Sequence, residues 1–556
     1  IERVAGRMPG TSVRRRAWAA PSLASVRGAH VSRIARVSLV ALVAAVLLPV
    51  GNGFARETGR PNIVVILVDD MGFADLGCYG GEIPTPHLDA LAANGLRFSQ
   101  CYNTARCCPT RASLLTGLSS HQAGVGHMTD DEHLPGYRGR LNDECVTIAE
   151  VLGDAGYFTC MAGKWHVGQN HGVAPWNRGF QRSLNPASGG FYYAGSPRYD
   201  LSLDGEPLAA DDPRLPAEWY TTDLWTTYGL QFIDEARAAG KPFFLYLAHN
   251  APHFPLQAPA AEIEKFRGRY KQGWDALARE RFERQKTLGL VDPRWIPASR
   301  PSAVAAWDGL SAEEQDRFDH LMAVYATTVH LMDRAVGDLV HGLRDRGLLD
   351  DTLILFMSDN GGNAESGPSG RSLGDPTQAD STWYCGESWA FVQNVPFRKS
   401  KHYVHEGGIA TPLIVHWPTG IGERGAWRPQ PAHVIDIMPT CVEVASATYP
   451  VERGGHRIQP TEGRSLVPAF RGEAVDREAL YWEHEGNAAV RVGDLKLVRT
   501  GRQGAWELYD LAADRTEQHD LAAARPSDVA ALAARWQTWA ERAHAEPAPE
   551  RPKKKR

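Results

Sequence analysis

The sequence predicts an α/β fold, in which one large, mostly parallel sheet lies between helices and a small antiparallel α+β domain follows near the C-terminus. Continuous apolar and β-branched runs at 62–68, 242–248 and 352–357 are typical of strands buried on both faces. Segments with helical spacing alternate with these runs, as in parallel sheets. From about residue 450 the pattern changes to short alternating strands, which favours an antiparallel sheet.

The elements of the large domain follow in chain order. We predict helices at 85–95, 107–116, 143–156 and 221–240, and strands at 62–68, 96–102, 157–161 and 242–248. A loosely helical insertion spans 260–307, and a capping box at Ser311 and Glu314 opens a long helix. Strands at 352–357 and 411–417 and a helix at 433–445 complete the domain. The small domain has strands at 479–484, 488–492, 495–500 and 506–511 and a helix at 527–543.

The first 55 residues are predicted to be a leader outside the fold. Arginines at 14–16, 33 and 36 precede an apolar run at 37–48, and small residues at 53–55 offer a cleavage site. This order is typical of a signal peptide, and the apolar run is short for a membrane-spanning helix. We therefore expect an exported protein, periplasmic or secreted, without a stable membrane anchor. An uncleaved anchor is the alternative.

The sequence pattern divides the chain into four segments, and its charge and cysteine content limit the partners and metal sites that we expect. We divide the chain into leader 1–55, large domain 56–448, small domain 449–545 and disordered basic tail 546–556. The 556 residues include 60 Lys and Arg against 65 Asp and Glu, so no basic field argues for nucleic acid. The eight cysteines lack the spacing of a zinc site or a disulfide framework, although one or two disulfides remain open.

Polar side chains follow two of the buried strands. Asp69 and Asp70 come after the strand at 62–68, and Asp359 and Asn360 come after the strand at 352–357. Ligands bind at the carboxyl ends of strands in α/β sheets, so we expect these four to line one crevice. Four oxygen ligands suit a hard divalent cation; we expect Ca²⁺, with Mg²⁺ as the alternative. Singly, each Asp would equally suit a turn or a helix cap.

Cys107 opens a short helix that should point into this crevice. Pro109 suits the first helical position and Gly117 suits the stop. The free N–H groups at the helix start, with Arg111 one turn on, favour an anion at Cys107. Either a low-pKa thiolate or a group made from the cysteine would fit. A buried cysteine pair without function is the plain alternative.

Cys107, Pro109 and Arg111, followed by Leu115-Thr116-Gly117, resemble the signature of the formylglycine-dependent sulfatases of the alkaline phosphatase superfamily, and most closely its bacterial arylsulfatases. Cys108 and Thr110 depart from the commoner residues. The resemblance covers about residues 61–521 through motifs at 163–166, 251–253, 358–361, 401–408 and 482–487. It implies an alkaline phosphatase-like fold and a formylglycine-generating maturation enzyme that oxidises Cys107 to an aldehyde, hydrated to a geminal diol.

The resemblance also implies roles at matching positions. Asp69, Asp70, Asp359 and Asn360 would hold the metal, Arg111 would steady the hydrated aldehyde, and Lys164 would bridge diol and sulfate. His166 would contact the second diol oxygen, while His253 and Lys401 would face the leaving group. The chemistry agrees, because cations stabilise a transferring sulfate and an acid must protonate the departing alcohol. Alone, Lys164 would be an ordinary surface charge and His253 an ordinary polar residue. His249, His402 and His405 receive no catalytic role.

The leading hypothesis is a sulfuric ester hydrolase of the arylsulfatase type, which releases inorganic sulfate from an organic sulfate monoester. The nearest rival hydrolyses phosphonate monoesters or phosphodiesters, because the same charges tolerate either tetrahedral anion. A rival of another class is an exported sulfate- or glycan-binding protein with an unmodified Cys107. The substrate could be an aryl, alkyl or carbohydrate sulfate; the insertion at 260–307 and the loop near Glu387 are expected to decide it.

Overall fold

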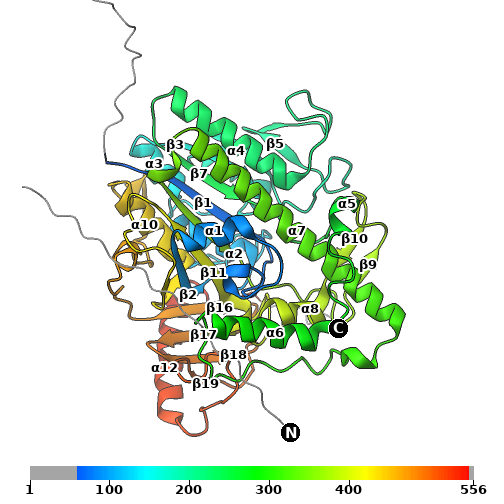
Figure 1. The fold of residues 1–556 in the computed structure, drawn as a ribbon. Coiled ribbons are helices and arrows are strands. Elements are labelled where there is room, and N and C mark those ends of the chain that lie inside the picture. The colour runs from blue at the N-terminus through cyan, green and yellow to red at the C-terminus, as the bar shows by residue number, and fades with distance from the viewer. Residues whose placement is uncertain (1–58, 550–556) are drawn as a thin grey trace, which may run out of the picture. The chain divides into compact units, whose positions relative to one another are not determined.

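The computed structural model describes residues 59–549, which all lie within one compact unit (Figure 1). The predicted leader 1–55 and residues 550–556 of the predicted tail lie outside the described residues. The division into a large and a small domain stays a prediction.

An eleven-stranded mixed sheet forms the centre of the described chain. Its middle strands run parallel, in the order β8 (Thr352–Ser358), β1 (Asn62–Val68), β7 (Phe243–Ala248), β3 (Phe158–Gly163) and β4 (Arg182–Pro186). Beyond β8, β11 (Ala410–His416) runs antiparallel to both β8 and β2 (Leu96–Tyr102). The expectation of a large, mostly parallel sheet is confirmed.

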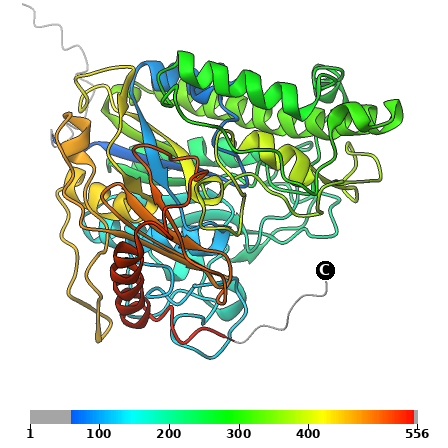
Figure 2. The ribbon, with the colours of Figure 1, turned by 90° about the horizontal axis from the view of Figure 1, so that it is seen from below.

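The side chains of β1 alternate between two cores because successive residues of a strand face opposite sides of the sheet. Val64, Ile66 and Val68 enter one apolar core, and the alternate residues 63, 65 and 67 enter the other. The first core is covered by α1 (Pro86–Ala93), α4 (Thr221–Ala238) and α7 (Ala312–Asp345). The second is covered by α2 (Cys107–Thr116), α3 (Ile148–Asp154) and α10 (Ile437–Val444). The long green helices in Figures 1 and 2 mark the first face.

A four-stranded antiparallel sheet forms the C-terminal part, with its strands in chain order. It consists of β16 (Leu480–His484), β17 (Asn487–Val492), β18 (Leu495–Arg499) and β19 (Glu507–Asp510), and α12 (Pro526–Arg542) packs on one face. The other face packs against the large sheet, since Trp482 and Val498 share an apolar core with Tyr102 at the end of β2. This packing brings the turn between β16 and β17 to the large domain.

The insertion at 260–307 packs on the large domain through α5 (Ala260–Ile263) and α6 (Gly273–Thr287). Trp274 of α6 lies edge-on to Trp307 and Trp389, with ring centroids 4.8 and 5.7 Å apart. Arg281 of α6 is fully buried and pairs with Asp75, just beyond β1, at 2.7 Å. The insertion therefore supports the segment that follows the first acidic pair.

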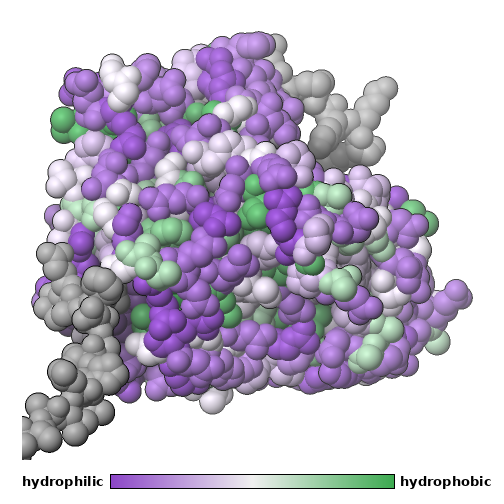
Figure 3. All heavy atoms as spheres, turned by 90° about the horizontal axis from the view of Figure 1, so that it is seen from above, coloured by the Kyte–Doolittle hydropathy of each residue, from purple (hydrophilic) through white to green (hydrophobic). Residues whose placement is uncertain are grey.

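Shorter elements complete the described chain. They are β5 (Leu201–Leu203), β6 (Glu206–Pro207), β9 (Arg371–Leu373), β10 (Thr382–Tyr384), α8 (Gly386–Gln393), α9 (Glu406–Ile409), β12 (Ala426–Arg428), β13 (Ala432–His433), β14 (Glu452–Arg453), β15 (His456–Arg457) and α11 (Val467–Phe470). The view in Figure 3 shows a largely polar surface with small apolar areas. Among the described residues, no helix combines the length and apolar character that a membrane crossing requires.

Two predicted helices start later than expected, and Pro109 has a different helical position. The helix expected at 433–445 begins at Ile437. The helix expected at 143–156 begins at Ile148, because Thr147 and Glu150 form a capping box that fixes the start there. The cysteine helix begins at Cys107 itself, with Arg106 as the residue before it, so Pro109 is the third helical residue rather than the first. Pro109 still lies in the first turn, where its missing N–H costs no helical hydrogen bond. Gly117 ends the helix with φ 72°, as expected.

Candidate active site

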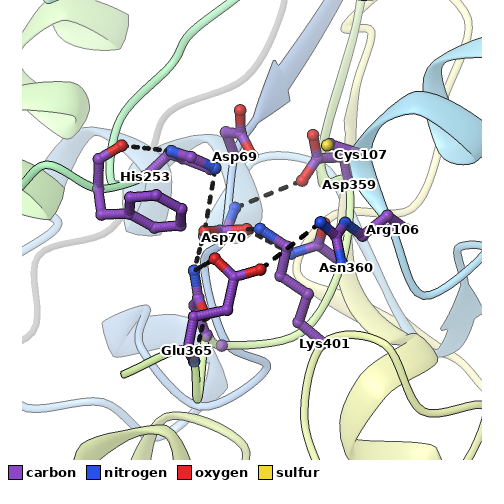
Figure 4. Close-up of polar contacts among 12 residues, drawn as sticks. Asp69, Asp70, Arg106, Cys107, His253, Asp359, Asn360, Glu365 and Lys401 are labelled. Carbon is purple, nitrogen blue, oxygen red and sulfur yellow. Dashed lines mark hydrogen bonds and ion pairs between the residues drawn. The ribbon is translucent and has the colours of Figure 1, made fainter. Parts of the chain in front are cut away.

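The two acidic pairs meet at the carboxyl ends of β1 and β8. The strands lie in register, with Val68 opposite Ser358, so the residues that follow them are neighbours. The Asp70 N–H donates to Asp359 Oδ1 at 3.3 Å, and Asn360 Nδ2 donates to Asp70 Oδ1 at 2.7 Å (Figure 4). Asp70 has φ 66°, an uncommon backbone conformation that turns the chain at this point. The structure thus brings all four predicted metal ligands together.

Helix α2 presents Cys107 and Arg111 to this site. Arg111 is fully buried; it donates to Asp359 Oδ2 at 2.7 Å and lies 3.4 Å from Asp69 Oδ2. One guanidinium therefore joins the two acidic pairs. Cys107 lies at the first helical position, where free N–H groups favour an anion, and it is 1% exposed. The predicted helix with its cysteine is placed beside the acidic cluster, as expected.

Lys164 and His166 follow β3, two strands from β1. Lys164 Nζ donates to Asp69 Oδ2 at 2.6 Å, and both side chains are buried. His166 has φ 59°, and its Nδ1 lies 3.6 Å from Cys107 Sγ. Gly163, at φ 111°, leaves no room for a side chain, since a Cβ there would lie 2.0 Å from the Ala248 carbonyl oxygen. Close packing of β3 on β7 therefore sets the position of both functional residues.

His253 and Lys401 come from two loops and converge on Asp70. Lys401 Nζ lies 2.7 Å from Asp70 Oδ1, and His253 Nε2 lies 3.5 Å from Asp70 Oδ2. Figure 4 shows both side chains pointing toward this carboxylate. All ten residues predicted for the site from sequence thus lie in one place, and their individual roles stay a prediction.

The carboxylates and the amide fit a hard cation. Among the described residues, Asp69 Oδ1 and Asn360 Oδ1 are buried atoms without a hydrogen-bond partner. Buried oxygen atoms are rarely left unpaired, and an oxygen-binding cation would satisfy them. Three aspartates against Arg111, Lys164 and Lys401 leave the cluster without net charge, so a divalent cation would restore the positive charge that an anionic ester needs.

The buried charges shift the pKa values of their neighbours. Interaction with the Cys108 thiol, together with Lys164 and His166, holds the pKa of Cys107 well below its usual value against the effect of burial. Burial and then Lys164 lower the pKa of His166 to about 4, so this ring is neutral at pH 7. Burial opposes a charged Lys401, but Asp70 raises its pKa, and the ammonium group persists. Lys164 and the start of α2 therefore favour an anion at Cys107.

A cavity of about 300 Å³ opens over Cys107. We call it the catalytic cavity; it is lined by Arg106, Cys107, Met128, Lys164, His166, Ser188, Gly190, Arg198, His253, Phe254, Glu365 and Lys401. The sequence interpretation missed Arg106, Arg198 and Glu365, and also Asn363, whose Nδ2 donates to Asp70 Oδ2 at 2.6 Å. Asn363 lies three residues beyond Asn360, so its nearness in the sequence to a predicted ligand is a signal that could have indicated it.

The large mixed sheet and its helices are those of the alkaline phosphatase-like fold. The chain belongs to the sulfatase family, since the family model for sulfatases matches residues 61–447. A second model, for the C-terminal part of N-sulphoglucosamine sulphohydrolase, matches residues 398–537. The predicted family and the predicted class of reaction, hydrolysis of a sulfuric ester, are confirmed.

Three relatives define the similarity. The chain is 35% identical to an arylsulfatase of Klebsiella aerogenes over 76% of this chain and 95% of that protein. It is 33% identical to an uncharacterised sulfatase of Schizosaccharomyces pombe over 86% of this chain and 93% of that protein. A crystal structure of a protein in complex with a neocarrahexaose matches 86% of this chain and 92% of the other, with TM-score 0.64 and 26% identity.

Proposed function

We propose that the chain hydrolyses sulfate monoesters of aryl or sugar alcohols, with Cys107 converted to formylglycine and one Ca²⁺ held by Asp69, Asp70, Asp359 and Asn360. The observation that carries the proposal is the placement of Cys107. It lies at a helix N-terminus, in one cavity with Lys164, His166, His253 and Lys401. The unpartnered oxygens of Asp69 and Asn360 support the cation. Mg²⁺ is the alternative ion.

The two groups absent from the chain supply the nucleophile and part of the charge. A hydrated aldehyde at Cys107 would offer one hydroxyl to attack sulfur and another to expel sulfate, and the cation would stabilise negative charge. The chain's own residues bind and orient the ester. Lys164, Lys401 and Arg111 supply fixed positive charge in a water-poor site, which is how enzymes stabilise a transferring anion.

His166 suits the role of base. Its ring is neutral at pH 7 and lies 3.6 Å from Cys107 Sγ, within reach of a hydroxyl group at that position. Conversion of Cys107 would remove a thiolate that raises the pKa of His166, and the ring would then be held neutral more firmly.

The alcohol that leaves requires a proton. Burial lowers the pKa of His253, so that ring is neutral at pH 7, whereas Lys401 carries a proton. Asp70 holds Lys401 at 2.7 Å and raises its pKa. A cation bound at Asp70 would compete for that charge and make Lys401 a stronger acid. We therefore assign proton donation to Lys401 and orientation of the leaving oxygen to His253.

The substrate class and setting complete the proposal. The catalytic cavity, at about 300 Å³, has room for a single aromatic or sugar ring. One relative is named an arylsulfatase, and another is described in complex with an oligosaccharide. Export rests on the arginines and the apolar run of residues 1–55, and maturation requires a formylglycine-generating enzyme.

One experiment tests the modification and the reaction together. The full chain is produced with and without a formylglycine-generating enzyme, and the peptide that contains Cys107 is analysed by mass spectrometry. We expect an aldehyde in place of the thiol only in the first sample, with hydrolysis of 4-nitrophenyl sulfate that exceeds hydrolysis of 4-nitrophenyl phenylphosphonate. Equal sulfate turnover by the unmodified thiol, or preference for the phosphonate, would refute the proposal.

A further inference from the structure

A second cluster of metal-binding side chains lies beside the catalytic cavity. His127 comes from the loop between α2 and α3, and His484 and Glu485 come from the turn between β16 and β17. One ligand atom from each lies within 4.8 Å of the others. His127 Nε2 is 3.0 Å from Glu485 Oε1, and His484 Nε2 is 3.9 Å from the same oxygen. A zinc ion with bonds of about 2.0–2.1 Å separates its ligand atoms by about 3.4 Å, so these spacings suit such an ion.

His484 provides independent evidence for a ligand. Its side chain is 0% exposed, and neither ring nitrogen has a hydrogen-bond partner among the described residues. Its ring stacks on that of His127, with centroids 5.5 Å apart and 15° between the planes. An imidazole buried without a partner costs free energy. A metal ion bound by one of these nitrogens would supply the missing partner.

The charges around the cluster favour a cation. Glu365 and Glu485 contribute two negative charges, and Arg106 lies 3.6 Å from Glu365 and 3.9 Å from Glu485. Two carboxylates against one guanidinium leave one net negative charge before the histidines are counted. His402 contacts Glu485 Oε2 and Glu365 Oε1, each at 3.0 Å, and so fixes the orientation of the Glu485 carboxylate. Such partners behind a ligand are typical of metal sites.

We propose that His127, His484 and Glu485 bind one divalent transition metal ion, with zinc as the expected ion. Two imidazoles and one carboxylate are the donors that zinc prefers, whereas Ca²⁺ and Mg²⁺ prefer oxygen alone. The site is therefore distinct in chemistry from the oxygen cluster at Asp69. A cavity of about 560 Å³, lined in part by His127 and Glu485, gives the ion a path from solvent.

The bound ion would fasten the rim of the catalytic cavity. Met128, next to His127, lines that cavity, as do Arg106 and Glu365. A metal that ties the loop of His127 to the turn of Glu485 would hold these three residues in place. Its role is positional, since none of its ligands reaches Cys107.

The test uses the full chain without a histidine tag, as the Cys107→Ala variant, so that maturation and turnover do not enter the readout. The protein is titrated with Co²⁺ in excess Ca²⁺, and then Zn²⁺ is added. We expect one equivalent of Co²⁺ with the visible absorption of a nitrogen-ligated ion, displaced by Zn²⁺. His127→Ala or Glu485→Gln should weaken zinc binding about a hundredfold, and His402→Ala about tenfold.

The matched control is His133→Ala, a change in the same loop at a side chain that is 87% exposed. It should leave zinc binding unchanged. Circular dichroism and thermal unfolding establish that each variant is folded, and the isosteric Glu485→Gln change is the variant least disturbing to the turn. Less than one equivalent bound by the parent, or unchanged affinity in folded His127→Ala and Glu485→Gln, would overturn the proposal. The outcome does not depend on the proposed reaction.

Discussion

Two clusters of buried charge use the same kinds of side chain with different results. The active site combines three aspartates with Arg111, Lys164 and Lys401. The second cluster, which we call the buried network, consists of Glu406, Lys496, Arg515 and Glu517 between the small sheet and β2. Lys496 lies 2.8 Å from Glu406 and 2.9 Å from Glu517, and Arg515 lies 2.7 Å from Glu406.

The active site differs from the buried network in its cavity and in the kind of atom that it leaves without a partner. Among the described residues, the active site leaves carboxylate and amide oxygens unpaired and borders a cavity, and it carries the strained residues Asp70 and His166. In the buried network both carboxylates lie within 3 Å of Lys496 Nζ. Its atoms without a hydrogen-bond partner in the described part of the chain are Arg515 Nη2 and Glu517 Oε1, and the latter is still 2.9 Å from that ammonium group. Oxygen atoms without a partner beside a cavity indicate a site for a ligand, whereas charges paired between two parts of a protein fix how those parts pack. The comparison predicts opposite losses when each cluster is broken.

The largest effect should follow from Cys107→Ala. We expect turnover of 4-nitrophenyl sulfate to fall at least about 10⁴-fold, because no nucleophile remains. The side chain is small, so the thermal midpoint should stay close to that of the parent. Initial rates and thermal unfolding of the two purified proteins check this. A variant with near-normal turnover would remove Cys107 from the mechanism.

The opposite loss is expected from Lys496→Met in the buried network. Removal of the ammonium group leaves Glu406 and Glu517 buried without the cation that they share, which should cost about 3–5 kcal/mol of unfolding free energy. Turnover per folded molecule should change little. Urea unfolding and rates in the absence of denaturant measure both. The double variant Lys496→Met with Glu406→Gln should lose less than the sum of the single changes; full additivity would show that the pair is not coupled.

Asp69→Asn should weaken metal binding and turnover more than it weakens the stability of the fold. Its Oδ1 is unpartnered, so loss of one negative charge should weaken the cation more than the packing. We expect a fall of about 10²–10³ in turnover, restored in part by excess Ca²⁺. In the parent, a chelator should abolish turnover and lower the thermal midpoint, and added Ca²⁺ should reverse both. Activity that survives exhaustive chelation would contradict a metal-dependent reaction.

The sequence could predict residues that lie together at the ends of parallel strands, but not contacts that depend on how distant segments pack. Asp69 and Asp359 were found because each follows a buried strand, and parallel strands end at one edge. Resemblance supplied Lys401 and His253. Nothing local indicated that Lys496 would meet Glu406, because that contact depends on how the small sheet packs. His402 received no role from its sequence, since its partners Glu365 and Glu485 lie on other loops.

The unfolding free energy should depend on pH through His166 of the active site. Burial and Lys164 lower the pKa of His166 to about 4 in the folded chain, against about 6.5 when unfolded. The unfolded chain therefore binds a proton first, and His166 should subtract up to about 3 kcal/mol of stability as the pH falls from 6.5 to 4. His166→Gln should flatten this part of the profile. Denaturant unfolding at several pH values checks it, and an unchanged slope would contradict a buried, neutral His166.

The smallest effect is expected at an exposed ion pair, which sharpens the contrast with the buried network. Lys265 Nζ lies 2.7 Å from Glu262 Oε2 beside α5, at the same distance as the pair of Arg515 and Glu406, but the Lys265 side chain is 58% exposed. Water and salt screen such a pair, so Lys265→Met should change the unfolding free energy by less than about 1 kcal/mol. Urea unfolding in parallel with Lys496→Met makes the comparison direct. If both changes cost the same, burial would not explain the stability that the network provides, and the distinction between the two clusters would have to rest on the unpaired oxygens alone.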